Sequence, residues 1–472
     1  TKFAPGKQWG YFPAGSIAWR ISNEKWMKPI RFISDLKLRA SYGLAGNNRI
    51  GNDLWHNIYR VYSGTSAPAF GNEEYNYYQF ADQTYLYDPD LKWETTITRN
   101  IGLDFGFFRN RLSGTVDVYW NTTKDLLVPS IIPNSSGYSR QMTNVGQTSN
   151  KGVEISLDAK IIQTKDFQLS ANFNVAFNKN KVDKLATGET EWKTKASLSN
   201  WYGTYNYKME VGKSMGLIYG FVNDGFYKVD DFDFDATTKK WTLKPGIPDN
   251  SSFSSGNFAF KPGAMKFKKL SDSESNLITE DDMTVIGDTN PKVTGGFGLS
   301  GNWKNLDFTA FFNYMCDFDV LNVNKLYLHS AVRRNYSNLS TDMNLANRFR
   351  YVDDAGVNVS SDPVALAALN ENAKTYSWMS VTQGITMTDL VEDGSFLRLS
   401  TLTVGYTLPK HWLRSLGVKS LRLYFSGSNL FTITGYSGYD PEVNIQKGLT
   451  PGIDNNVTPR SRVYTVGVNL NF

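Results

Sequence analysis

Several features that would mark an enzyme or a helical membrane protein are scarce in this chain of 472 residues. The single cysteine, Cys316, cannot form a disulfide within the chain, and no apolar run approaches the roughly 18 residues that a membrane-spanning helix needs. A helical membrane protein is therefore excluded. The formal net charge of +5 is small for this length and gives no case for nucleic-acid binding.

Groups that carry chemistry are also scarce. The three histidines, His56, His329 and His411, stand far apart without metal-ligand spacing, and the sequence has no phosphate-binding loop, paired-cysteine site or nucleophile elbow. We expect no enzymatic activity. The run Asp230-Asp231-Phe-Asp233-Phe-Asp235 resembles the start of a calcium loop, but Ala236 and Thr242 replace the expected Gly and Glu. An exposed acidic loop is the simpler interpretation, with a structural calcium as the alternative.

Alternation of apolar and polar residues is abundant instead. The last segment carries an apolar set that reaches the terminal aromatic residue: Tyr464, Val466, Val468, Leu470 and Phe472. Small polar residues and Gly467 occupy the positions between them. This period of two predicts a strand with one face toward lipid and one toward a lumen. The edge strand of a soluble sandwich is the alternative for this segment alone.

The same pattern recurs along the chain. Alternating pairs are predicted at 15–21 with 36–42, 97–107 with 112–121, 153–161 with 167–177, 293–303 with 306–316, and 396–408 with 421–430. Short polar turns such as Arg109-Asn110 and Lys304-Asn305 join several of these pairs, as in β-hairpins. Cys316 continues the apolar set of its strand, so we expect a lipid-facing or packed thiol.

Long connections alternate with the short turns, at 43–92, 124–149, 178–292, 317–395 and 431–460. Short turns at one rim and long loops at the other are typical of outer-membrane barrels, in which the short turns are periplasmic. The predicted strands number 11, and the β-rich stretch 211–227 can add zero or two spanning strands by parity. Because bacterial barrels close with an even number, we expect an odd number of strands from an upstream portion. The chain also starts at Thr1 in mid-pattern without a signal peptide.

The long connections are rich in aromatic residues that could contact a ligand. The candidate binding residues are Trp55, His56, Tyr59, Trp201, Tyr202, Tyr205 and Tyr207. Flat rings among Asn and Asp suit the apolar faces and hydroxyls of sugars. Interfacial aromatic girdles and packing between loops are the alternative, and the more frequent, use of such residues.

At these residues the chain resembles the SusC/RagA family of TonB-dependent outer-membrane transporters. The resemblance rests on the order of several motifs: Phe3 to Pro13, Asp35 to Gly43, Leu91 to Thr95, Asn150 to Glu154, Asp393 to Arg398, Asn429 to Phe431, Tyr436 to Glu442, and the terminal Phe472. It implies an all-β fold, a transmembrane antiparallel barrel of 22 strands with long extracellular loops. This chain would supply about 11–13 of those strands, so residues 1–472 would be the carboxyl-terminal portion of a barrel whose plug and first strands lie outside it.

The resemblance also implies function and partners. It implies TonB-dependent import of oligosaccharides, with import of oligopeptides as the alternative. We expect no cofactor, with the structural calcium described above as the alternative. The implied partners are a SusD-like surface lipoprotein, TonB acting through the absent plug, the N-terminal part of the transporter, and a second transporter–lipoprotein pair. We expect polar residues on the lumen face to tune plug seating: Asn100, Asp104, Asp117, Glu154, Asp158, Asn172 and Asn174.

Two other classes compete with active import. A passive outer-membrane channel would have an open lumen and no plug, and the upstream sequence would decide between the two. A barrel enzyme would need a clustered nucleophile and base, against which the three scattered histidines argue.

Overall fold

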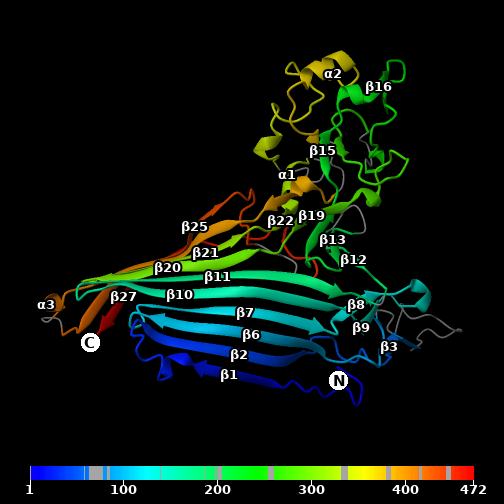
Figure 1. Ribbon diagram of the computed structural model, residues 1–472. Coiled ribbons are helices and arrows are strands. Elements are labelled where there is room, and N and C mark those ends of the chain that lie inside the picture. Colours follow the sequence, from blue (N-terminus) through cyan, green and yellow to red (C-terminus); the bar gives the residue numbers. More distant parts are fainter. Residues whose placement is uncertain are drawn as a thin grey trace. The chain divides into compact units, whose positions relative to one another are not determined.

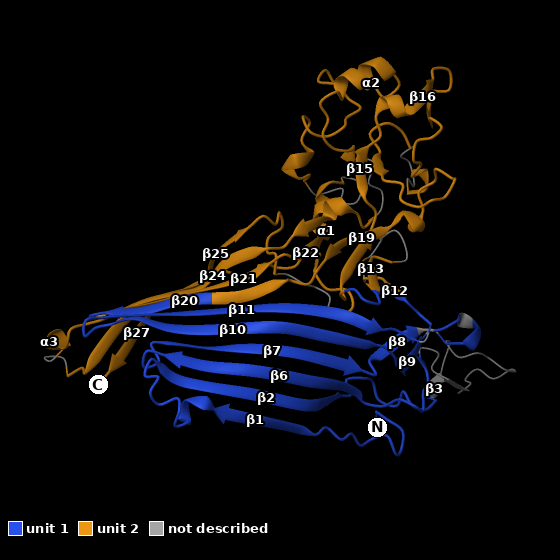
Figure 2. Ribbon diagram, viewed as in Figure 1, with its two compact units in different colours: residues 1–191, 210–213, 297–304 blue, residues 192–209, 214–296, 305–472 orange. Residues whose placement is uncertain are grey.

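The structure is a computed structural model that describes residues 2–57, 59–62, 78–81, 85–138, 140–186, 188–196, 198, 205–253, 260–330, 338–378, 384–413, 417–442 and 448–472. None of the helices in these ranges has the length and hydropathy needed to cross a membrane. The chain divides into two compact units (Figure 2). Unit 1 comprises residues 1–191, 210–213 and 297–304, and unit 2 comprises residues 192–209, 214–296 and 305–472.

The predicted alternating segments form one large sheet (Figure 1). Its 11 strands are hydrogen-bonded in chain order. They are β1 (Ala14–Arg20), β2 (Ile33–Asn47), β6 (Glu94–Phe107), β7 (Leu112–Lys124), β10 (Gln147–Gln163), β11 (Phe167–Lys184), β20 (Val293–Trp303), β21 (Leu306–Cys316), β24 (Phe396–Thr407), β25 (Ser420–Thr434) and β27 (Val463–Asn471). β1 and β27 stand at the two ends of this order.

Within unit 1, the hairpins close as the turn residues predict. Phe108, Arg109 and Asn110 all have positive φ between β6 and β7, so the chain reverses within a left-handed turn. Across β10 and β11, Val153 lies opposite Phe177 and Leu157 opposite Phe173, which keeps apolar residues on one face. Unit 1 also contains β3 (Tyr59–Tyr62), β4 (Tyr78–Ala81), β5 (Tyr85–Leu86), β8 (Leu127–Ile131), β9 (Arg140–Asn144), and the 3-10 turns η1 (Ile21–Asn23) and η3 (Asn134–Ser136).

Within unit 2, the long connections fold into small sheets rather than open loops. Their strands are β12 (Glu191–Thr194), β13 (Tyr207–Glu210), β14 (Leu217–Gly220), β15 (Asn223–Phe226), β16 (Phe232–Asp235), β17 (Lys240–Leu243), β18 (Met265–Phe267), β19 (Thr284–Asp288), β22 (Asp319–Asn322), β23 (Val391–Asp393) and β26 (Ile453–Asp454). The α-helices are α1 (Val323–Leu328), α2 (Pro363–Leu369) and α3 (Lys410–Leu413), and the 3-10 turns are η4 (Val229–Asp231), η5 (Ser251–Phe253), η6 (Glu280–Asp282), η7 (Thr341–Met343) and η9 (Thr388–Leu390).

One hydrophobic core unites three of these connections. Ile218, Phe267, Leu321, Met387 and Ile453 are all buried in it, although they come from the segments 178–292, 317–395 and 431–460. Phe221 stacks on Phe267 with ring centroids 5.0 Å apart. Sequence separation hides this core, because no single connection contributes enough apolar surface to reveal it.

Two local expectations are decided by these small elements. The stretch 211–227 forms β14 and β15, which belong to small sheets, so it adds no strand to the large sheet. The acidic run is not a loop, because Phe232 is buried and Phe234 packs on Trp241 in the hairpin β16–β17. Asp235 accepts hydrogen bonds from the backbone N–H of Thr237 and Thr238. Among the described residues, no group of three or more His, Cys, Asp or Glu could hold a metal ion. Cys316, the last residue of β21, is a free and exposed thiol.

Candidate functional site

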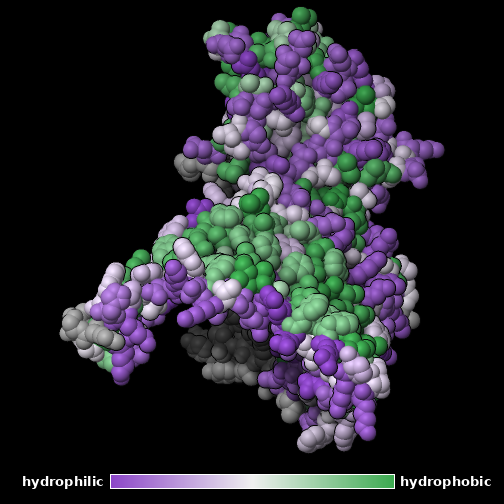
Figure 3. Space-filling model, turned by 60° about the vertical axis from the view of Figure 1, so that its left-hand side comes forward, coloured by the Kyte–Doolittle hydropathy of each residue, from purple (hydrophilic) through white to green (hydrophobic). Residues whose placement is uncertain are grey.

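One face of the large sheet exposes apolar side chains. In unit 1 these include Ile17, Trp19, Leu38, Tyr42, Ile101, Val118, Trp120, Phe173 and Phe177, and in unit 2 Val404, Tyr406, Leu423, Phe425, Tyr464, Val466, Val468, Leu470 and Phe472. Ile17 is 76% exposed and Val466 is 81% exposed. Figure 3 shows hydrophobic side chains gathered in continuous areas of the surface rather than scattered singly. Such a face is suited to lipid rather than water.

The opposite face of the sheet in unit 1 carries a cluster of charged residues, the Arg39 cluster: Lys37, Arg39, Asp104 and Asp117. The Arg39 Nη2 atom lies 2.8 Å from Asp104 Oδ1 and 3.0 Å from Asp117 Oδ2. Lys37 Nζ lies 3.4 Å from Asp104 Oδ2. The cluster remains about one third open, since the Arg39 side chain is 31% exposed.

A glycine makes room for this arginine. Arg39 lies opposite Gly102 on β6, and Gly102 lies opposite Asp117 on β7. A Cβ atom on Gly102 would come within 2.5 Å of Arg39 Nη2 and of Asp117 Oδ1. The guanidinium therefore passes over Gly102 of the middle strand β6 and reaches Asp104 on that strand and Asp117 on β7.

The other polar residues predicted for the lumen lie on this same face. Asp158 pairs with Asn172 and Ser156 with Asn174 across β10 and β11. Glu154 lies opposite Asp117 on β7. Asn100 lies opposite Ser41 on β2. All of them alternate with the exposed apolar residues, which confirms the polar face, whereas a role in seating a plug stays a prediction.

The same device recurs in unit 2. Arg422 on β25 donates from Nε to Asp307 Oδ1 at 2.8 Å, and its Nη2 also contacts Asp307 Oδ2. A Cβ on Gly405, on the strand between them, would collide with the Arg422 guanidinium. Register places Asp307 opposite Gly405. An arginine across a glycine thus fixes the polar face of the sheet in each unit.

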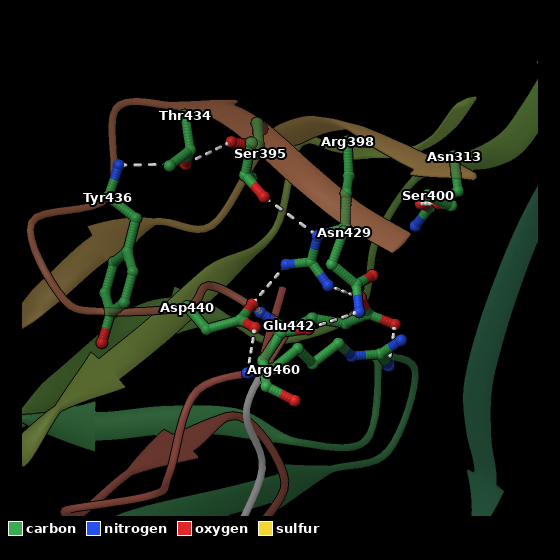
Figure 4. A network of polar contacts seen from close by, with 12 residues as sticks. Asn313, Ser395, Arg398, Ser400, Asn429, Thr434, Tyr436, Asp440, Glu442 and Arg460 are labelled. Carbon is green, nitrogen blue, oxygen red and sulfur yellow. Dashed lines mark hydrogen bonds and ion pairs between the residues drawn. The ribbon is translucent and has the colours of Figure 1, made fainter. Parts of the chain in front are cut away.

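A second kind of cluster lies in unit 2 around a buried arginine, and we call it the Arg398 cluster: Arg398, Thr432, Asp440, Glu442 and Arg460. Figure 4 shows Arg398 between Asp440 and Glu442, with Arg460 at the exposed side of Glu442. Arg398 donates from Nε to Thr432 Oγ1 at 3.0 Å, from Nη1 to Glu442 Oε2 at 2.8 Å and from Nη2 to Asp440 Oδ1 at 2.5 Å. Arg460 Nη2 donates to the second Glu442 oxygen at 2.6 Å. Arg398 is only 2% exposed, so the cluster binds the segment after β25 to the strands β24 and β25.

A buried tyrosine continues this attachment. The hydroxyl of Tyr436 donates to Asp454 Oδ2 at 2.8 Å, and Asn324 donates to the other Asp454 oxygen at 2.9 Å. Burial raises the pKa of Tyr436, and the negative charge of Asp454 raises it further. The hydroxyl therefore stays protonated as a donor. The motifs at Asp393 to Arg398 and Tyr436 to Glu442 are visible in the sequence, but the pairing between them is not.

The predicted aromatic binding residues fall in both units, with Trp55, His56 and Tyr59 in unit 1 and Tyr205 and Tyr207 in unit 2. Trp55 and His56 contact each other edge to face, with ring centroids 4.5 Å apart, and Asp53 lies 3.4 Å from His56 Nε2. Tyr59 is the first residue of β3, where it pairs with Ala81. Tyr205 is partly buried, and Trp201 and Tyr202 lie outside the described residues.

Tyr207 is a core residue. Its ring is fully buried among the residues of the shared core, and its hydroxyl donates to the carbonyl of Pro451 at 2.5 Å. Burial also raises the pKa of this hydroxyl. Its aromatic ring thus serves packing in the described fold, which is the structural alternative weighed for these residues.

The sequence matches a known protein family and several of its members. Residues 1–430 match the family model described as TonB dependent receptor-like, beta-barrel. The chain is 31% identical over 478 residues to TonB-dependent receptor P3 of Formosa agariphila, in an alignment that covers 100% of this chain and 43% of that protein. It is 29% identical to TonB-dependent receptor SusC of Bacteroides thetaiotaomicron, covering 100% of this chain and 41% of SusC. The chain thus spans less than half the length of these relatives.

A solved structure has the same fold. The RagAB peptide transporter matches with a TM-score of 0.73 and 26% identity, and the match covers 100% of this chain and 44% of that chain.

Proposed function

We propose, from the premise that the chain belongs to the TonB-dependent receptor-like β-barrel family and is of the SusC/RagA type, that it forms part of an active importer in the bacterial outer membrane. The cargo would be an oligomeric nutrient that is too large for simple pores. Energy would come from TonB, which would act on a plug domain outside this chain. The chain itself would make and break no covalent bond.

One observation carries the proposal. The 11-stranded sheet has one face with a band of exposed apolar side chains and a polar face with charged clusters, while its long connections build a packed core of their own. A passive pore needs only the strands that form the barrel wall. A folded domain between the strands supports selective capture of cargo before passage.

The strand order supports a second part of the proposal. β1 and β27 stand at the two ends of the sheet with one strand partner each among the described residues. Open edges of this length would aggregate unless another segment paired with them. We propose that residues 1–472 are the carboxyl-terminal portion of the barrel, and that upstream strands close it.

The polar face of unit 1 supports a plug contact. Arg39 and Asp104 are partly exposed there, so groups of an inserted domain could pair with them. The partners of the complete transporter would be this plug, TonB, and a SusD-like lipoprotein over the long connections. The complete assembly would hold two transporter–lipoprotein pairs.

For the cargo we propose an oligosaccharide. Trp55 presents a partly exposed indole beside Asp53 and His56, which is the combination of a flat apolar ring and polar groups that binds sugars. A peptide is the second candidate, and likeness to the RagAB peptide transporter favours it. The two classes share the import mechanism and differ in the groups that hold the cargo.

The test uses cells that carry the full-length transporter with its lipoprotein. Uptake of labelled oligosaccharides and of labelled peptides is compared with and without a proton uncoupler. Energy-dependent sugar uptake that falls about tenfold in Trp55→Ala would support the proposal, since stacking contributes about 1–1.5 kcal/mol. Uptake that continues unchanged with the uncoupler would make the protein a passive channel.

A control separates cargo contact from loss of folding. Tyr207→Phe removes only the hydroxyl bond to Pro451 in the core, so it should lower stability slightly without changing which cargo is taken up. Energy-dependent uptake of peptides alone, insensitive to Trp55→Ala, would make the protein a peptide importer.

The incomplete-barrel part has its own test. Residues 1–472 produced alone in detergent should not give the heat-resistant, fast-migrating monomer that closed barrels show on gels. The full-length protein is the positive control. A stable closed monomer from residues 1–472 would contradict the need for upstream strands.

A further inference from the structure

A row of cations lies on the lipid-facing side of unit 1, just beyond the apolar band. Lys151 lies opposite Trp120 on β7 and opposite Lys179 on β11. Alternation puts these residues on the side of Val153 and Phe177, not on the side of Glu154. Arg99 on β6 belongs to the same row, because it lies opposite Tyr42 and donates to the Trp120 carbonyl at 3.3 Å.

The two lysines at the centre of the row repel each other. Residues directly opposite in an antiparallel pair have Cβ atoms about 5 Å apart, and like charges there are destabilising. Both side chains are exposed, and neither makes an ion pair with another described residue. A bound anion would relieve this repulsion.

Nearby carboxylates do not supply that anion. Asp183 is on the same face, but it accepts hydrogen bonds from Ser149 at 3.0 Å and Gln147 at 3.2 Å and lies 3.9 Å from Lys181. The Asp183 carboxylate is therefore already paired with Lys181 and is not available to Lys151 or Lys179. Glu154 points to the opposite face of the sheet.

The position of these cations along β10 fits the boundary between the apolar core of the membrane and its headgroups. On β10 the apolar set runs from Val153 to Ile161, which is about 26 Å along the strand at 3.3 Å per residue. A strand tilt near 40° reduces this to roughly 20 Å, close to the apolar band of a barrel. Lys151 is the next outward residue after that band, at the end of β10 that faces the long connections.

The other end of the same strands differs. On β6 the outward residues near the short turn are aromatic: the ring centroids of Phe105 and Phe107 lie 5.3 Å apart, and that of Phe107 lies 6.2 Å from that of Phe32, just before β2. Aromatic residues serve any membrane interface. The turn residues Arg109, Arg111 and Lys165 apart, the outward positions of these strands in unit 1 carry cations at the long-connection end, which indicates a leaflet with anionic headgroups there.

We propose that Arg99, Lys151 and Lys179 bind the phosphate of a lipid A-type glycolipid in the outer leaflet, with the acyl chains along Val153 and Phe177. Arg99 uses Nη1 for Trp120 and Thr122, and no described residue accepts from its Nε or Nη2. These N–H groups and the two ammonium groups are the donors of the proposed site: Lys151 and Lys179 are directly opposite each other, and Arg99 reaches them across β7, where Trp120 lies between. The inference requires only the outer-membrane location and is independent of the cargo.

The test uses the full-length transporter, purified in detergent and stripped of lipid. The probes are lipid A with one phosphate, the same lipid after removal of the phosphate, and inorganic phosphate, each titrated by native mass spectrometry. The double variant Lys151→Gln/Lys179→Gln should bind phosphorylated lipid A about 30-fold more weakly, from about 1 kcal/mol for each lysine near a charged surface.

The matched control is Lys160→Gln/Lys165→Gln, which removes the same charge from the β10–β11 hairpin at the short-turn end. It should bind like the unchanged protein. Equal loss in both variants, or equal affinity for lipid without phosphate, would overturn the proposal. Inorganic phosphate that binds as tightly as the lipid would reduce the row to a simple anion site and also overturn it. If the double variant does not migrate as a folded barrel, Lys151→Gln alone is used, with an expected loss of about fivefold.

Discussion

The two arginine clusters are built from the same chemical groups but are held in different surroundings. In the Arg398 cluster, the arginine is 2% exposed and each side-chain nitrogen has its own acceptor. In the Arg39 cluster, the side chain is 31% exposed and two carboxylates share it. A sealed charge must keep its partners, while an open one can exchange them for water or for another protein segment. The first arrangement suits attachment of a loop, and the second suits a surface that another domain contacts.

The largest expected effect is therefore at Arg398. Arg398→Ala leaves Asp440 and Glu442 as close, poorly solvated carboxylates, and breaking such a buried pair costs about 3–5 kcal/mol. The segment 435–462 should detach from β24 and β25. Limited proteolysis of the full-length protein should then cut this segment much faster than in the unchanged protein.

The control restores charge balance without restoring the arginine. In Arg398→Met/Asp440→Asn/Glu442→Gln no buried charge is left, so protease resistance should return in large part. A single variant Arg398→Ala that resists cleavage like the unchanged protein would show that the apolar contacts of this segment hold it without the ion cluster.

An intermediate effect is expected at Asp282, a buried anion in unit 2. Burial alone raises the pKa of Asp282, but the backbone N–H groups of Ser271, Thr279 and Leu270 and the Lys269 ammonium outweigh it and lower this pKa to about 2. A carboxylate with a depressed pKa stabilises the fold above its unfolded value near 3.8, and this contribution is lost as pH falls toward 2. Its size is about 2 kcal/mol.

Acid proteolysis of residues 268–283 measures this contribution. Cleavage by pepsin should rise between pH 4 and pH 2 in the full-length protein, and Asp282→Asn should be cleaved readily at both pH values. Asp281→Asn changes the exposed neighbouring carboxylate and should behave like the unchanged protein. Equal behaviour of the two variants would mean that burial does not set the strength of these ion contacts.

The contrast between clusters also explains what the sequence could predict. Alternation identified all strands of the large sheet, because the side-chain period of two survives in every one of them. It placed Asp104 and Asp117 on the polar face, since register along a strand follows from sequence alone. It did not reveal that Asp440 and Glu442 meet Arg398, because that contact depends on how the segment after β25 folds back.

The long connections are less predictable. Their aromatic residues were candidates for ligand binding, with packing between loops as the more frequent alternative, and Tyr207 belongs to the shared core. The shared core combines contacts inside one connection, such as Phe221 with Phe267, with contacts between residues more than two hundred positions apart. Tyr207 and Pro451 are one such pair, joined by a hydrogen bond. Pattern analysis within a window cannot detect a core assembled from distant pieces.

The smallest effect should come from the open cluster. Arg39→Gln removes a partly solvated pair, which typically contributes about 0–1 kcal/mol and is weakened further by salt. Gly102→Ala is the companion variant, because its methyl group would displace the guanidinium while keeping the charge. The temperature at which the full-length barrel loses its folded gel migration should fall slightly in both, and less at high salt.

If Arg39→Gln instead lowered this unfolding temperature strongly and independently of salt, the Arg39 cluster would behave like the buried Arg398 cluster. The arginine would then be buried in the complete protein, although unit 1 leaves it about one third exposed. Residues outside this chain would have to cover it, because a charge that water reaches cannot cost several kcal/mol when it is removed. That result would locate the contact between the polar face of unit 1 and an inserted domain at Arg39, Asp104 and Asp117.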